Sequence, residues 1–121
     1  AVKSLIDDIA HETKHIPQMA DLVKAVRHVT DYMIGASTPD RLAGSYPYLT
    51  MLSTATCGWL LAKQAKAAES ALANGEGDAA FLQAKLNSVR FYIEQIVPAA
   101  IGLTASAIAG DEALPLVPNV A

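Results

Sequence analysis

The 121-residue sequence has little cysteine, few aromatic residues and few charges, and each scarcity excludes a class of protein. Its one cysteine, Cys57, cannot form a disulfide within the chain or build a cysteine-rich metal site. Aromatic residues make up 6% of the chain and β-branched residues form no alternating run, which argues against a β-sandwich or a barrel. The nine basic residues are scattered from Lys3 to Arg90 and the net charge is −3, so we expect no nucleic-acid partner.

The longest stretch without a charged residue, 42–62, raises the question of a membrane span. It contains Gly44, Pro47 and several hydroxyl side chains, so we expect a helix buried within the protein and no membrane span. The chain shows no basic-then-apolar leader, and its low cysteine content fits a reducing compartment, so we expect a cytoplasmic protein. The chain starts with Ala1 rather than methionine, which fits a processed N-terminus and also fits a fragment of a larger chain, the expectation we adopt.

Alanine, the best helix former, supplies 23 of the 121 residues, and apolar residues recur at helical spacing. A short helix over 2–15 has three apolar residues facing inward, Leu5, Ile6 and Ile9. Pro17 ends it, because the residue before a proline avoids the helical conformation. A second helix over 17–34 has an apolar stripe made of Met19, Val23, Val26, Thr30 and Met33. Gly35 is its expected end.

A long helix is predicted over 46–73, after a connection over 36–46 that holds a short turn capped by Thr38. Its inward positions step by four and three residues: Tyr48, Leu52, Ala55, Trp59 and Ala62. Gly75 ends this helix and Asp78 caps the next one, so the two are joined by a tight turn.

The last helix, over 79–109, has the strongest apolar stripe in the chain: Leu82, Leu86, Val89, Ile93, Ile96, Ala100, Leu103 and Ala107. Pro98 predicts a kink within it, and Gly110 ends it. We therefore predict an all-α fold: a mostly antiparallel, up-and-down bundle of about four helices, dominated by a long C-terminal helical hairpin. The predicted domain covers residues 1–114, and residues 115–121 are predicted to form an extended or disordered tail.

The segment HETKH matches the zinc-peptidase pattern, in which two histidines four residues apart bind zinc and the glutamate is the general base. Here these residues are His11, Glu12 and His15. Lys14 places a cation beside the metal position, and Pro17 breaks the helix just beyond it. No third ligand follows at a familiar spacing, so we expect a solvent-exposed polar face and no metal site.

No other motif in the sequence predicts catalysis. Cys57 lies within a helix and far in sequence from every histidine, so we expect a small buried hydrophobe rather than a nucleophile. The carboxylates do not pair in a predicted pocket, and no nucleophile, phosphate-binding or dinucleotide-binding motif occurs. We therefore predict no catalytic, cofactor-binding or metal-binding residue.

Several residues of the hairpin are predicted to lie either in the core or at an interface. Arg90 lies in an apolar helix beside Tyr92, with Glu94 four residues further on. An ion pair at an interface and an arginine that covers the core with its aliphatic part both fit this pattern. Tyr48 and Trp59 leave the same choice open, with core packing the simpler expectation.

Four elements of the hairpin occur in a recognisable order and spacing: Tyr48-Leu49, Gly58-Trp59, Phe81-x-x-x-Lys85-Leu86, and Arg90-Phe91-Tyr92-x-Glu94 ahead of Pro98. Together they resemble the extra C-terminal domain of one branch of the acyl-CoA dehydrogenases. The run from 107 to 114, through Gly110-Asp111-Glu112, also resembles the way those proteins end.

The resemblance implies a flavoprotein parent that uses FAD to oxidise an acyl-CoA thioester to the 2,3-enoyl-CoA. In that family FAD and the catalytic glutamate belong to upstream domains, and nothing in residues 1–121 matches those parts. It further implies an accessory domain that packs on the catalytic body or on a neighbouring subunit, within a homo-oligomer. A different hypothesis is a self-contained helical interaction or regulatory protein that dimerises through its hairpin.

Overall fold

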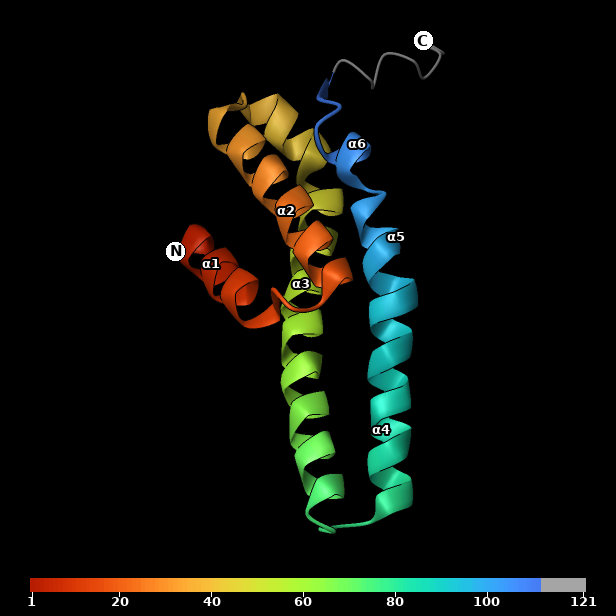
Figure 1. Ribbon diagram of the computed structural model, residues 1–121. Coiled ribbons are helices and arrows are strands. Elements are labelled where there is room, and N and C mark those ends of the chain that lie inside the picture. Colours follow the sequence, from red (N-terminus) through yellow and green to blue (C-terminus); the bar gives the residue numbers. More distant parts are fainter. Residues whose placement is uncertain (112–121) are drawn as a thin grey trace, which may run out of the picture.

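A computed structural model of the chain describes residues 1–111, which form helices and no strand (Figure 1). The elements are α1 (Val2–Thr13), α2 (Pro17–Gly35), α3 (Thr38–Ala73), α4 (Ala79–Phe91), the π-helical segment η1 (Tyr92–Ile96), α5 (Val97–Ile101) and α6 (Thr104–Ala107). The expected all-α bundle with a dominant C-terminal hairpin is confirmed. The predicted tail, 115–121, and the predicted domain end at 114 lie outside the described residues.

One arm of the hairpin is α3, and the other is the continuous run of α4, η1 and α5 (Figure 1). Both α1 and α2 contact α3, and α2 also contacts α5. The turn end of the hairpin extends beyond α1 and α2, so it has no covering helix within the described residues (Figure 1). No helix among residues 1–111 is long and apolar enough to cross a membrane.

The core lies where α1 and α2 meet the hairpin. Its largest fully buried side chains come from all of these elements: Ile9, Met19, Leu22, Met51, Val26, Val29 and Val97. Burying one such side chain contributes roughly 1.5–3 kcal/mol. The predicted inward faces of α1 and α2 are therefore confirmed, although α1 ends at Thr13 and α2 is buried over a wider face than one stripe.

The predicted connection over 36–46 is wrong, because α3 begins at Thr38 and runs through this segment. Ser37, rather than Thr38, caps the helix: its hydroxyl accepts a hydrogen bond from the backbone N–H of Asp40 at 3.3 Å. Pro47 lies inside the helix, where it removes one backbone hydrogen bond. Packing of this first part of α3 against α2 and α6 keeps it helical in spite of that loss.

The turn between α3 and α4 has the predicted chemistry. Gly75 and Gly77 adopt positive φ angles of 68° and 72°, which favour glycine. The Asp78 carboxylate accepts hydrogen bonds from the backbone N–H groups of Ala80 and Phe81, at 3.0 and 3.3 Å. Asp78 therefore caps α4 as expected.

The last helix is not the single helix predicted over 79–109. Its backbone widens at η1, where the N–H of Val97 donates to the carbonyl of Tyr92, five residues earlier. This widened turn directly precedes Pro98, which cannot donate a backbone hydrogen bond. The chain then leaves the helix at Gly102 before the short α6.

The widened turn shifts the apolar stripe by one residue. Ile96, predicted to face inward, is 40% exposed, and Val97 takes its place with 0% exposure. A π turn holds one residue more than an α turn, so the buried position after Ile93 is Val97 rather than Ile96. The prediction for Ile96 is therefore wrong, while Val89, Ile93, Ala100 and Ala107 are buried as expected.

The end of the described chain is fastened to the start of α3. The carboxylate of Asp40 accepts a hydrogen bond from the backbone N–H of Asp111 at 3.0 Å. That bond, followed by the hydrogen bond with Ser37, lowers the pKa of Asp40 below its usual value. Gly110, just before this contact, has a positive φ of 75°.

Candidate interaction surface

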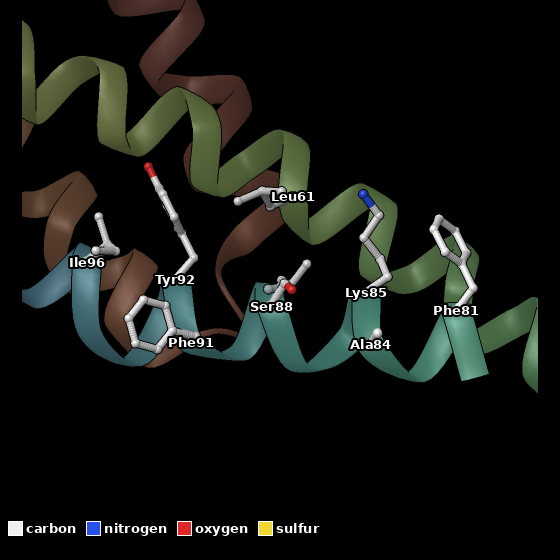
Figure 2. A pocket seen from close by; sticks show the side chains of 9 residues that line it. Leu61, Phe81, Ala84, Lys85, Ser88, Phe91, Tyr92 and Ile96 are labelled. Carbon is white, nitrogen blue, oxygen red and sulfur yellow. The ribbon is translucent and has the colours of Figure 1, made fainter. Parts of the chain in front are cut away.

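A groove runs between the two arms of the hairpin, and every residue that lines it belongs to α3, α4 or η1. It consists of two depressions of about 450 and 430 Å³ that share Tyr92. We call it the hairpin groove and define it by Leu49, Cys57 and Leu61 on α3 and by Phe81, Lys85 and Tyr92 on the facing arm. Figure 2 shows Phe81, Lys85 and Tyr92 extending from α4 and η1 toward α3.

Large apolar side chains along the groove are exposed to solvent. Tyr46 is 81% exposed, Phe81 65% and Phe91 60%, and Ile96 lies near Phe91 on the groove wall (Figure 2). Contiguous exposed apolar surface marks a site of interaction more often than scattered apolar residues do. The signal in the sequence was the position of Phe81 and Phe91 outside the predicted apolar stripe, and sequence reasoning missed it.

Tyr92 joins the two halves of the groove. Its hydroxyl donates a hydrogen bond to the Thr54 carbonyl oxygen at 3.3 Å, which ties η1 to α3. Burial raises the pKa of the Tyr92 phenol, and the neighbouring Cys57 adds to this effect. The phenol is therefore a neutral hydrogen-bonding group in the wall of the groove.

Cys57 is exposed, so the expectation of a small buried hydrophobe is wrong. It comes one residue before Gly58, which is buried against the side chain of Met19. One residue along an α-helix is a rotation of about 100°, so Cys57 turns away from Met19 and lines the groove. A cysteine is hydrophobic enough to be buried in a core. Whether Cys57 is buried or exposed depends on which face of α3 packs against α2.

Tyr48 connects α3 to α2. Its hydroxyl lies 2.8 Å from the hydroxyl of Thr30, which also donates to the Val26 carbonyl at 2.8 Å. The ring is half-buried against the core.

Trp59 is half-buried against the core, on the side of the hairpin that faces α1. The Lys63 ammonium lies 4.3 Å from the centre of its ring and 3.5 Å from a carboxylate oxygen of Glu12. The indole Nε1 is buried without a hydrogen-bond partner within the described residues. The ring therefore contributes apolar contact and a cation–π interaction, but no hydrogen bond.

Because the indole N–H has no partner, Trp59→Phe should change the free energy of unfolding by less than about 1 kcal/mol. Trp59→Ala should lower it by about 3 kcal/mol, since the apolar contacts are lost. Urea titration followed by circular dichroism measures both variants, because Trp59 is the one tryptophan and its fluorescence disappears with it. An equal loss in both variants would show that a phenyl ring does not replace the contacts of the indole.

Arg90 and Glu94 form an ion pair on the outer surface of α4 and η1. Arg90 Nε lies 3.0 Å from Glu94 Oε1, and the Arg90 side chain is 76% exposed. An exposed pair four residues apart in a helix contributes only a few tenths of a kcal/mol. Arg90 therefore adds little to the stability of the described chain.

The HETKH segment does not gather its histidines on one helical face. Because α1 ends at Thr13, His15 falls beyond the helix, and His11, Glu12 and His15 are all exposed. Glu12 pairs with Lys63 instead. Within residues 1–111 no group of three histidine, cysteine or acidic side chains is arranged to hold a metal ion.

Comparison with known proteins identifies the family of this chain. The sequence profile of a family described as acetyl-CoA dehydrogenase C-terminal like matches residues 2–117. The 3-methylmercaptopropionyl-CoA dehydrogenase of Ruegeria pomeroyi is 44% identical over 55 residues, which cover 46% of this chain and 9% of that protein. No solved structure matches the chain. The family match spans every described helix, so the chain belongs to the acetyl-CoA dehydrogenase C-terminal-like family.

Proposed function

We propose that the chain is the non-catalytic C-terminal helical domain of an FAD-dependent acyl-CoA dehydrogenase and packs on the catalytic body or on a neighbouring subunit. The observation that carries this proposal is the family match over residues 2–117. The segment shared with the Ruegeria pomeroyi enzyme is only 9% of that enzyme, which fits a domain that is one part of a larger parent. A homo-oligomer and a cytoplasmic location are part of the proposal; the exposed, unpaired Cys57 is compatible with a reducing compartment.

The described residues do not fit a flavin site. A dinucleotide pyrophosphate is usually held at a glycine-rich turn that leads into a helix N-terminus. The glycine-containing turn of this chain leads into α4, but the Asp78 carboxylate already occupies that N-terminus. A second negative charge there is unfavourable, which supports the proposal that FAD and the catalytic residues belong to other parts of the parent.

Under this proposal, the residues predicted to lie in the core or at an interface form two groups, one packed within the domain and one at its surface. Tyr48 and Trp59 pack within the domain, since one bonds to Thr30 and the other lies against the core. Tyr92 lines the hairpin groove, and the exposed pair Arg90 and Glu94 lies on the same arm. The proposal assigns Tyr92 to the side that faces the rest of the enzyme, and the ion pair of Arg90 and Glu94 to a second exposed face of the same arm.

The first experiment is to purify the native polypeptide that contains this sequence and to measure its mass and its flavin content. We expect a yellow protein several times heavier than 12.7 kDa. Deleting the segment that corresponds to residues 1–111 should then change its oligomeric state in light scattering while flavin stays bound. A colourless protein of about 12.7 kDa that forms a dimer would overturn the proposal in favour of a self-contained interaction protein.

A further inference from the structure

We propose that the hairpin groove receives a single amphipathic helix from the catalytic part of the parent enzyme, and that this helix carries a carboxylate which pairs with Lys85. The inference rests on the proposed function and adds to it the docking face and the chemistry of the partner.

The shape of the groove favours one helix over a second copy of the hairpin. Two adjacent antiparallel helices leave a concave channel, and the convex ridge of a third helix fills it. A second copy would present the same concave channel and leave the volume of about 450 Å³ beside Phe81 and Tyr92 unfilled. From Leu49 to Leu61 the α3 arm rises about 18 Å, which a partner helix of three to four turns would span.

The charges around the groove also favour a partner helix over a second copy of the hairpin. Lys85 is half-buried in the groove wall and forms no ion pair within the described residues. The α3 residues that line the groove carry no charge, and Glu69 of α3 lines the side of the hairpin that faces α1 instead. A partner carboxylate would compensate this cation, whereas a second copy of the groove would bring another lysine and no acid.

The widened turn at η1 supplies the apolar contacts. By shifting the register, it buries Val97 and leaves Ile96 beside Phe91 on the groove wall (Figure 2). In an uninterrupted α-helix Ile96 would belong to the buried stripe instead. Exposed aromatic and aliphatic residues next to one charged group have the composition of the centre of an interface.

The test uses the full-length parent enzyme, with Cys57 as the reporter. Cys57 lines the groove, so a docked helix should protect it from N-ethylmaleimide, as measured by mass spectrometry of the tryptic peptide 42–63. Ser88→Arg, which fills the groove from an exposed position, and Lys85→Glu should each raise the alkylation rate by at least about tenfold. The matched control is Lys24→Glu, the same charge change on the exposed side of α2, and it should leave the rate unchanged.

A photo-crosslinking residue in place of Phe81 identifies the occupant directly. We expect a crosslink to a helix of the catalytic part that contains Asp or Glu, and changing that acid to lysine should restore protection in the Lys85→Glu enzyme. Crosslinks between two hairpins, or equal alkylation of Cys57 in the native and Ser88→Arg enzymes, would overturn the inference. Either result in a flavin-containing enzyme leaves the proposed function standing, whereas a native protein without a dehydrogenase part defeats the proposed function itself.

Discussion

Gly44→Ala should lower the free energy of unfolding of the chain by about 3 kcal/mol, although it adds a single methyl group. Gly44 is buried where α3 meets α6, and a Cβ there would overlap the backbone carbonyl oxygen of Ala107. It would also lie 2.8 Å from the terminal methyl of Met33. A side chain can change rotamer to make room, but a backbone carbonyl moves only if α6 moves away from α3.

Two other glycines provide the matched controls. At Gly58 a Cβ would lie 2.6 Å from the sulfur of Met19, a flexible side chain, so Gly58→Ala should cost less than Gly44→Ala. At Gly35 nothing lies within 4 Å, so Gly35→Ala should be neutral or stabilising by up to about 1 kcal/mol. Urea titrations should therefore show Gly44→Ala as the least stable variant, Gly58→Ala as intermediate and Gly35→Ala as the most stable. A Gly44→Ala chain as stable as the Gly35→Ala chain would disprove the close contact between α3 and α6.

The features that follow local rules could be predicted from the sequence. Apolar residues at steps of three and four predicted α1, α2 and the two arms of the hairpin. Gly75 and Asp78 predicted the turn between those arms. The start of α3 could not be predicted in this way, because Pro47 has the local properties of a helix breaker. The helix continues past it because α2 and α6 pack on this part of α3, and that information is tertiary.

The candidate interaction surface could be predicted only in part. The motifs of the hairpin identified the family, but they do not say which side of the hairpin α1 and α2 cover. That choice makes Cys57 a groove residue and places Trp59 on the side facing α1. Phe81 and Phe91 carried a usable signal, since two large aromatic residues outside an apolar stripe are unexpected on a surface that faces only water.

The register shift at η1 can be tested with two substitutions. A last helix that contains the π turn and an uninterrupted α-helix predict opposite results for them. Val97→Asp should unfold the chain at neutral pH, because it buries a carboxylate without a partner at a position that is 0% exposed. The expected loss, about 4 kcal/mol or more, is comparable to the entire stability of many domains. Ile96→Asp should remain folded, because this residue lies on the surface of the groove.

Comparing Val97→Asp with Ile96→Asp controls for helix propensity, because both variants introduce aspartate into the same run of helix at adjacent positions. Circular dichroism of both variants at pH 7 therefore reports burial alone. An uninterrupted α-helix with Ile96 in its buried stripe would give the reverse order, with Ile96→Asp unfolded. Folded Ile96→Asp protein also separates stability from docking: in the full-length enzyme it should expose Cys57 to alkylation, because its new charge faces the apolar wall of the proposed partner helix.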